Sequence, residues 1–475
     1  MTSPLGMSLA QASAALARRE ISALELVDAA ILRAGQINPA LNAFVRIDAQ
    51  AARSLASDSD HTRATGTARS ALEGIPMAHK DMFHRAGIAN SCGARVRQPL
   101  PQSTATVLRQ LDAAGAVQFG VLHMAEFAFG PTGHNWSIGH CRNPWNPARI
   151  TGGSSSGPAA AVAARACFAA LGSDTGASIR LPASMNGITG LKTSYGRVSR
   201  AAAMPLSFSL DTVGPLARSA YDCAMVLQAI AGHDPRDPTT SRAAVPDYLR
   251  HIGDSVRGLR VGVPTSYFTQ GVDAAIDLRM QASLDVLRGL GCVLVPVDPG
   301  DMAAANTAGI LVTAAEAAAQ HAAMLRSQGD LYARQVRIRV ERGYAISAPQ
   351  YLDALRYRGL ALAAFTEAVF SRVDVLHAPV VPVPTPDILA TDIQDGPALD
   401  PLLGDLTRFL RPFNYLGLPA LALPGGFLDD GMPVGFQLIG RPFREDQLLQ
   451  LGHAYQSATD WHHRAPPENF NPGTA

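Results

Sequence analysis

The sequence predicts an α/β fold in which helices cover both faces of a β-sheet. Short apolar runs at residues 75–80 and 116–122, and again at 259–263 and 292–297, are typical of buried strands, and helical patterns lie between them. This alternation favours a sheet with a helix layer on each face. The 475 residues are 47% hydrophobic and only 17% charged, so the chain can bury a large core.

The first expected elements are two helices within residues 8–37, where apolar residues recur at helical spacing. Ser22 can cap the second helix, because Glu25 stands three residues later in the pattern of a capping box. Residues 54–71 are polar and small, and we expect an exposed segment there. It leads into the buried strand that ends at Lys80.

Two turns rich in Gly and Ser flank a segment of small apolar residues. The first turn is GGSSSG at 152–157, and the second begins SDTGAS at 173–178. Pro158 and the alanines after it predict a helix that starts just after the first turn, because Pro is tolerated at the first helical position. Residues 167–171 predict a short buried strand. A unit of loop, helix, strand and loop can fold back and bring the two serine turns together.

A serine hydroxyl is a weak nucleophile until a base removes its proton. Lys80 is the candidate base, because burial at the end of a strand favours a neutral amine, and a neutral amine can accept a proton. A lysine at a strand end is more often simply solvated. Lys80 therefore becomes a candidate only in combination with the two serine turns.

Three other kinds of site fit parts of this sequence less well. The residues 153–157 match G-x-S-x-G, which would make Ser155 the nucleophile of an elbow that directly follows a strand. The preceding NPWNP at 143–147 contains two prolines and cannot be a central strand. No Gly-Lys-Ser/Thr follows the glycines, which argues against a phosphate-binding P-loop. The polar run at 233–237 could suggest a metal, but it lies around prolines and is more typical of a surface loop.

The order of Lys80, GGSSSG and SDTGASIR resembles the amidase signature family of serine hydrolases. The resemblance extends from about residue 9 to residue 467 and is strongest at 74–218 and 413–443. It implies a single amidase domain over residues 1–475, with a signature core at 74–218. The implied fold is a mixed central sheet of about ten strands covered by helices on both faces.

The resemblance also implies roles for individual residues. Ser178 is the nucleophile, Ser154 is a bridging serine that follows a cis peptide bond, and Lys80 is the base. The implied oxyanion hole consists of consecutive backbone N–H groups, those of Thr175, Gly176, Ala177 and Ser178. The long loop at 126–150 is placed along the substrate cavity, and its neighbourhood supplies the expected substrate-binding residues Phe129, Gly130 and Thr151. Plain core packing explains Phe129 equally well.

Two positions depart from the family's usual pattern. SGP stands at 156–158, where a pair of glycines and a small residue commonly follow the two serines. Ala177 stands where the second of two glycines usually precedes the nucleophile. If position 177 requires a positive φ, alanine would be strained there by about 1–2 kcal/mol, whereas a negative φ would make it harmless.

Several supporting elements are expected around this core. We interpret Asp174 and Arg180 as supports that hold the nucleophile turn, and residues 211–215 as a turn. The region 303–364 is helical and Ala-rich, and we expect it to cap the mouth of the active site. Further strands are expected around residues 375–382, 420–423 and 434–439.

The composition of the chain indicates which binding partners it lacks and in which cellular compartment it occurs. Forty basic and 39 acidic residues give a net charge of +1 without a basic run, which argues against nucleic acid or an anionic membrane as a partner. Five scattered cysteines without a C-x-x-C pair predict reduced thiols in a cytoplasmic protein. We see no secretory signal and no apolar run long enough to cross a bilayer.

The sequence thus predicts a hydrolase that cleaves the C–N bond of amides through an acyl-enzyme on Ser178, with esters, anilides and carbamates as accessible side substrates. No metal or cofactor is implied, because proton transfer from Ser178 through Ser154 to Lys80, together with the backbone N–H donors, suffices for acyl transfer. We expect a small-molecule amide as the partner, no direct contact with nucleic acid and no membrane, and leave a homodimer open. Two alternatives remain. One is the glutaminase (A-type) subunit of a tRNA-dependent amidotransferase, and the other is a non-catalytic homologue.

Overall fold

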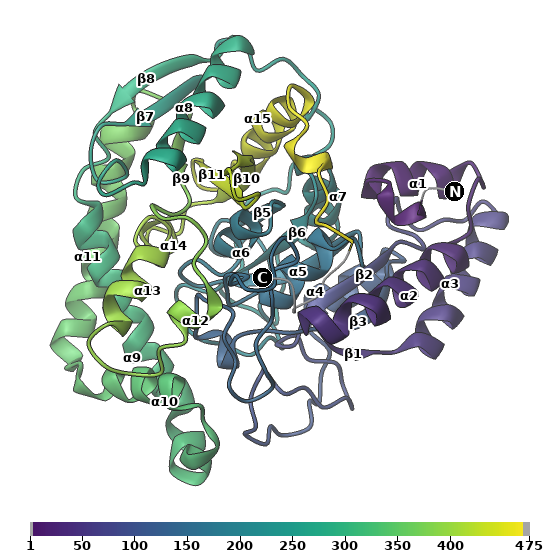
Figure 1. The fold of residues 1–475 in the computed structure, drawn as a ribbon, viewed down its shortest axis with the longest axis horizontal. Coiled ribbons are helices and arrows are strands. Elements are labelled where there is room, and N and C mark those ends of the chain that lie inside the picture. The colour runs from purple at the N-terminus through teal and green to yellow at the C-terminus, as the bar shows by residue number, and fades with distance from the viewer. Residues whose placement is uncertain (1–2, 469–475) are drawn as a thin grey trace.

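An 11-stranded mixed sheet runs through the protein, which we describe over residues 3–468 in a computed structural model (Figure 1). The strands are Phe44–Ile47 (β1), Pro76–Lys80 (β2), Val117–Leu122 (β3), Ala169–Asp174 (β4), Thr189–Lys192 (β5), Thr212–Ala217 (β6), Arg260–Pro264 (β7), Val293–Val297 (β8), Val375–Pro379 (β9), Ala420–Phe427 (β10) and Pro433–Ile439 (β11). Their order across the sheet is β1-β3-β2-β4-β6-β5-β10-β11-β9-β7-β8.

The centre of the sheet is antiparallel, and parallel pairs lie toward both ends. Strands β4, β6, β5, β10, β11 and β9 pair antiparallel in that order. Strand β2 is parallel to β3 and β4, and β7 is parallel to β8 and β9. Because β10 and β11 insert between β5 and β9, the beginning and the end of the chain share one sheet.

Helices cover the sheet from every part of the chain. They are Leu9–Ala17 (α1), Ala23–Leu41 (α2), Ala49–Ala64 (α3), Thr106–Ala113 (α4), Ser156–Ala163 (α5), Arg180–Met185 (α6), Ala220–Ile230 (α7), Ala274–Gly289 (α8), Met302–Gln328 (α9), Arg334–Glu341 (α10), Ala348–Phe365 (α11), Ile388–Thr391 (α12), Leu399–Thr407 (α13), Arg411–Tyr415 (α14) and Glu445–Ser457 (α15). In Figure 1, α1, α2 and α3 lie at one end of the molecule, and α9 and α11 lie at the opposite end.

Burial along the central strands confirms helices on both faces. Every residue of β2, β4, β5, β6, β9, β10 and β11 is buried. Successive side chains of a strand point to opposite faces, so continuous burial requires cover on both. The fold class that the sequence predicts is therefore confirmed, with one strand more than the expected ten.

Local sequence signals located most elements correctly. Ser22 caps α2, and its side chain and that of Glu25 form the predicted reciprocal capping box. Ser219 caps α7 by accepting the N–H of Asp222. The segment expected to be exposed at 54–71 is mostly exposed, but its first part belongs to α3, a helix that the sequence pattern did not predict. The polar, hydroxyl-rich composition of α3 gives a weak helical pattern, because the helix buries only a few small side chains.

The turn predicted at 211–215 is also wrong, because these residues enter the central strand β6. Gly and Pro normally punctuate strands. At Gly214, however, an added Cβ would lie 2.0 Å from the carbonyl oxygen of Leu191, so glycine is what allows β6 to approach its neighbour. Pro215 lies just beyond the two residues that pair with β5, where a missing N–H removes no ladder hydrogen bond on that side.

Helix α9 corrects another expectation. Within residues 3–468, one helical stretch, Met302–Leu331, is long and apolar enough to cross a membrane by length and composition. The core helix of a soluble protein passes the same test, and α9 packs against α10, α11 and α14. Its buried Glu316 accepts hydrogen bonds from the hydroxyls of Ser207 and Ser209, which joins α9 to the segment before β6.

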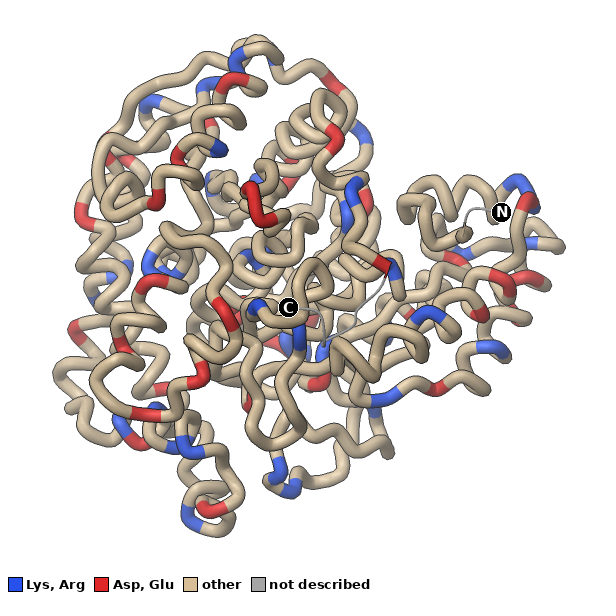
Figure 2. Tube along the Cα trace, viewed as in Figure 1, with Lys and Arg blue, Asp and Glu red and all other residues tan. Residues whose placement is uncertain are grey.

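Charged residues of both signs are interspersed along the trace (Figure 2). Many form ion pairs at the surface, such as Arg53 with Asp28 and Arg85 with Asp112. Such exposed pairs contribute little to stability individually. They keep the surface balanced in charge, in agreement with the net charge of +1.

Gly157 at the start of α5 permits close packing of two backbone segments near the serine turns. A Cβ atom there would lie 2.4 Å from the backbone N of His123 and 2.5 Å from the carbonyl oxygen of Ala43. We expect Gly157→Ala to lower the free energy of unfolding by about 2–3 kcal/mol, because two backbone segments would have to move. Urea unfolding checks this value. The control Gly35→Ala changes an exposed position of α2, where an added Cβ would have no atom within 4 Å, and it should be neutral or stabilising. Equal losses in both variants would contradict the packing argument.

Candidate active site

Lys80 ends β2 inside the protein, where its side chain is fully buried. Its Nζ donates to Ser154 Oγ at 2.7 Å and to Ser173 Oγ at 2.9 Å. Burial lowers the pKa of Lys80 from its usual 10.5 to about 7, against the opposing negative charges of Asp174 and Asp211. A substantial fraction of Lys80 is therefore neutral near pH 7 and able to accept a proton.

The first serine turn is tied to the second by backbone contacts. The peptide bond between Gly153 and Ser154 is cis. The N–H of Ser155 donates to the carbonyl oxygen of Ser178 at 3.2 Å, and Ser155 Oγ exchanges hydrogen bonds with the backbone of Ser173. The fold thus brings Lys80, Ser154 and the Ser178 turn together, as the loop, helix, strand and loop pattern predicts.

The turn before Ser178 presents unused backbone donors. Within residues 3–468, none of the N–H groups of Thr175, Gly176, Ala177 and Ser178 donates to another backbone or side-chain acceptor. Ala177 is not among the residues with positive φ, so the strain that its side chain would cause in that conformation does not arise. Consecutive free donors at a fixed turn suit the stabilisation of a developing oxyanion.

Asp174 and Arg180 support this turn, as predicted. Asp174 accepts from the N–H of Ile179 at 3.1 Å and pairs with Arg180, Nε to Oδ2 at 3.0 Å. Burial alone would raise the pKa of Asp174, but the charge and hydrogen bonds of Arg180 outweigh it and bring this pKa to about 2. Asp174 is therefore ionised, and the pair holds both ends of the turn.

Two residues near the C-terminus extend this support. Asn414 Nδ2 donates to Asp174 Oδ1 at 2.9 Å, and its Oδ1 accepts from Arg180 at 2.6 Å. Gln437 Oε1 accepts from Arg180 at 3.0 Å. Both residues lie in the stretch 413–443, where the resemblance to the family is among the strongest. Sequence reasoning missed their role, and the only signal was their place in that stretch.

A third missed residue is Ser173, the second hydrogen-bond partner of Lys80. In the sequence, Ser173 stands out only as the first residue of the second serine turn. A pocket of about 250 Å³ reaches Ser173 and Asp211, with Met82, Met204 and Phe208 also in its lining. Asp211 accepts the hydroxyl of Thr175 at 2.5 Å, so this pocket adjoins the supports of the turn.

The predicted substrate-binding residues lie along the first serine turn. The carbonyl oxygen of Gly130 would be 2.5 Å from a Cβ on Gly153, so the two glycines are in close contact. Thr151 is fully buried, and its hydroxyl donates to the carbonyl of Gly152 at 2.9 Å. Phe129 is largely buried, with the guanidinium of Arg339 3.9 Å from its ring centroid. Contact of these three with a substrate stays a prediction.

One group in the long loop has the composition of a metal site. His134, His140 and Asp392 bring ligand atoms within 4.8 Å of one another. His140 Nδ1 accepts the N–H of Asn135 at 3.0 Å, so a neutral His140 carries its proton on Nε2, which lies 4.0 Å from Asp392. His134 bonds Thr391 through Nε2 and keeps Nδ1 without a partner. The group offers a metal two free ligands rather than three, and we assign none.

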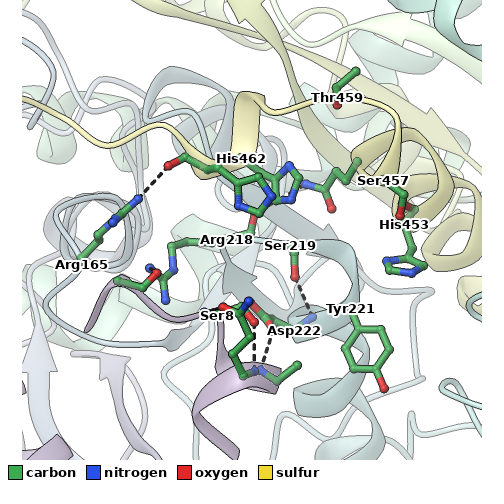
Figure 3. A pocket seen from close by; sticks show the side chains of 15 residues that line it. Ser8, Arg165, Arg218, Ser219, Tyr221, Asp222, His453, Ser457, Thr459 and His462 are labelled. Atoms are coloured by element: carbon green, nitrogen blue, oxygen red, sulfur yellow. Dashed lines mark hydrogen bonds between the residues drawn. The ribbon is translucent and has the colours of Figure 1, made fainter. Parts of the chain in front are cut away.

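A larger pocket, of about 390 Å³, lies between the N-terminal segment, α7 and α15 (Figure 3). Arg165 donates to the carbonyl oxygen of His463 at 2.7 Å, and Arg218 donates to that of Leu5 at 2.9 Å. None of the predicted catalytic or substrate-binding residues lines this pocket. Its cationic side chains join the first and last segments of the chain.

Comparison with known proteins identifies the family. The model of the family described as Amidase matches residues 25–449. The A-type subunit of glutamyl-tRNA(Gln) amidotransferase from Halorhodospira halophila is 40% identical over 97% of this chain and 98% of that protein. The protein of the same name from Roseiflexus castenholzii is also 40% identical, over 98% of each chain.

Solved structures agree in fold. One, described as a vestigial protein complex that reveals the origins of an s-triazine catabolic enzyme, has a TM-score of 0.89 at 32% identity and covers 95% of this chain and 98% of that chain. The A-type glutamyl-tRNA(Gln) amidotransferase subunit of Thermotoga maritima has a TM-score of 0.80 at 28% identity, with 96% of each chain covered.

These relatives contradict the partners expected from the sequence. We expected a small-molecule amide substrate, no direct contact with nucleic acid, and left a homodimer open. The relatives instead carry the name of one subunit of an amidotransferase, and that name includes a glutamyl-tRNA. A balanced surface charge does not reveal such partners, because a subunit can join an assembly through an uncharged surface. Both the family model and the relatives nevertheless agree with the motifs, and the chain belongs to the amidase signature family.

Proposed function

We propose that this protein hydrolyses the C–N bond of an amide through an acyl-enzyme on Ser178, and that it acts as an A-type subunit with a protein partner. The observation that carries the catalytic part is the hydrogen bond of 2.7 Å between buried Lys80 and Ser154, beside the turn that ends at Ser178. The identity of 40% to A-type amidotransferase subunits over nearly the whole chain supports the second part.

The proposed reaction needs only groups of this chain. Ser178 Oγ attacks the amide carbon while its proton passes through Ser154 to neutral Lys80, and the free N–H groups of the turn receive the oxyanion. The C–N bond then breaks as the same relay returns the proton to the leaving nitrogen. Water attacks the acyl-enzyme by the reverse proton path, which releases the carboxylic acid and restores Ser178.

A free-standing hydrolase of other amides, with esters, anilides or carbamates as side substrates, is the second candidate function. One observation favours it, because the match to the solved structure of a 6-aminohexanoate cyclic dimer hydrolase, with a TM-score of 0.88 at 26% identity, is higher in TM-score than the match to the Thermotoga maritima protein. A non-catalytic homologue is disfavoured, since Lys80, Ser154 and Ser178 are all present and Ala177 carries no strain.

Purification from the source organism tests the proposed assembly. We expect tagged protein to co-purify with a second polypeptide in fixed stoichiometry, and the complex to release ammonia from glutamine. Size-exclusion chromatography with mass spectrometry of the eluate measures the first, and an ammonia assay the second. The control is Ser178→Ala, which should retain the partner and lose ammonia release. Elution as a single fully active polypeptide would instead favour the free-standing hydrolase.

A further inference from the structure

Asp211, the residue before β6, is a buried carboxylate that contacts the turn of the predicted oxyanion hole. Its Oδ1 accepts the hydroxyl of Thr175 at 2.5 Å and the N–H of Ser207 at 3.1 Å. Its Oδ2 accepts the N–H of Leu206 at 2.9 Å and that of Ser207 at 3.1 Å. All of these groups donate, so they match an ionised carboxylate, which only accepts. A charged acceptor of this kind forms strong hydrogen bonds and holds the side chain of Thr175 in place.

The peptide group that joins Asp174 to Thr175 is fixed from its carbonyl side as well. This carbonyl oxygen accepts the hydroxyl of Thr212 at 2.8 Å and the Nδ2 of Asn414 at 3.0 Å. A trans peptide group is planar, so its carbonyl and its N–H point in opposite directions. The bonds to the carbonyl therefore orient the N–H of Thr175, the first free donor of the turn, and Asp211 fixes the side chain of the same residue.

A second buried carboxylate, that of Glu316, ties the segment before β6 to α9. Its Oε2 accepts the hydroxyl of Ser207 at 2.5 Å, and its Oε1 accepts that of Ser209 at 2.6 Å. The same Oε1 accepts the hydroxyl of Tyr351 on α11 at 2.8 Å. Ser207 bonds Glu316 through its hydroxyl and Asp211 through its N–H. One chain of hydrogen bonds thus leads from α9 and α11 to the turn.

Neutral donors alone balance the charges of the two carboxylates. Within residues 3–468, no lysine, arginine or histidine nitrogen lies within 4.0 Å of Asp211 or Glu316. A buried charge that loses a donor is costly, so the donors around each carboxylate have little freedom to move. An oxyanion hole depends on donors that are in place before the negative charge develops. The rigid chain supplies this condition at Thr175.

We propose that Asp211 is a positioning residue for the oxyanion hole, acting through the hydroxyl of Thr175, and that Glu316 anchors it to α9 and α11. The inference rests on the proposed acyl transfer at Ser178 and goes beyond it. It assigns part of the catalytic rate to groups that do not react themselves. Because α9 and α11 belong to the region expected to cap the active site, the chain couples the packing of that region to kcat.

Two substitutions of Thr175 test the proposal while the backbone N–H stays in place. Thr175→Val removes the hydroxyl that Asp211 accepts. We expect kcat for ammonia release from glutamine or butyramide to fall by about 10- to 100-fold and KM to change by less than about 3-fold. Thr175→Ser restores a hydroxyl and should recover most of this loss. An equal loss of kcat in both variants, or a change confined to KM, would overturn the proposal.

A double variant tests whether Asp211 acts through Thr175. Asp211→Asn places an NH₂ group against backbone N–H donors, so kcat should fall as it does in Thr175→Val. The double variant should lie within about 3-fold of Asp211→Asn alone, because both changes break the same contact. Glu316→Gln, one step farther along the chain, should lower kcat by about 3- to 10-fold. A loss in the double variant equal to the product of the single losses would overturn the proposal.

Asp222→Asn is the matched control for the loss of a buried carboxylate. Asp222 accepts the N–H of Ala10 at 3.1 Å and lines the larger pocket, which none of the predicted catalytic residues reaches. This variant should lower the free energy of unfolding and change kcat by less than about 2-fold. A fall in kcat as large as that of Asp211→Asn would assign both effects to general destabilisation and overturn the positioning role.

Labelling of Ser178 with a fluorophosphonate separates this proposal from the function on which it rests, and it decides also where neither amide is turned over. The phosphoryl oxygen of the reagent takes the oxyanion position, so the labelling rate should fall in Thr175→Val and recover in Thr175→Ser. No adduct in the unaltered protein would overturn the proposed acyl transfer. An unchanged labelling rate in Thr175→Val would overturn the positioning role alone. If Asp211→Asn does not fold, the two variants of Thr175 decide.

Discussion

Ser178→Ala is expected to lower kcat/KM for amide hydrolysis by about 10⁴- to 10⁶-fold while the protein remains folded. The reason is that no other group can form the acyl-enzyme, whereas the free N–H groups of the turn still bind the substrate carbonyl. Intact mass after incubation with a fluorophosphonate provides the second measurement. The unaltered protein should gain a single adduct that Ser178→Ala lacks.

Ser155→Ala is the matched control, because Ser155 is the nucleophile that the G-x-S-x-G pattern would assign. Its hydroxyl lies in the same turn but bonds to the backbone of Ser173 rather than to Lys80. This variant should still form the adduct. An adduct that persists in Ser178→Ala and disappears in Ser155→Ala would exchange the two roles and contradict the proposed mechanism.

Lys80→Met is expected to lower kcat/KM by at least about 10³-fold, because the relay loses its only candidate base. In the unaltered protein kcat/KM should rise with pH and level off above about 7, since burial lowers the pKa of Lys80 to about 7 and the neutral amine is the reactive form. A pH–rate profile measures this. Near-normal activity of the variant at neutral pH would remove Lys80 from the mechanism.

Buried Lys80 should also make the free energy of unfolding depend on pH. Between pH 7 and 10 the unfolded chain keeps the proton of Lys80, whereas the folded protein has released it, since the folded pKa is about 7 against a usual value of 10.5. The free energy of unfolding of the unaltered protein, minus that of Lys80→Met, should therefore rise with pH by about 1.4 kcal/mol per unit across this range. Urea unfolding at several pH values checks it. A constant difference would mean that Lys80 is not neutral when folded.

Local sequence patterns correctly predicted the elements that are stabilised by residues close to one another in the chain. The capping box of Ser22 and Glu25 involves residues three apart, and the buried strands at 76–80 and 117–122 lie in short, largely apolar runs. Local patterns failed at β6, where the glycine and proline signals for a turn were overridden by close approach to β5. They also failed at α3, where a helix rests on few buried contacts.

The sequence by itself determined the fold class, the family and the candidates Lys80, Ser154 and Ser178, because each lies in a short motif that can be recognised without its surroundings. Only the tertiary structure decided what surrounds them. The contact between Arg180 and Asn414 joins residues 234 positions apart, and the bonds of Ser207 to Glu316 and Arg339 to Phe129 are similarly remote in sequence. Which charged groups come into contact depends on how distant segments of the chain pack against one another. A local sequence pattern carries no information about that packing.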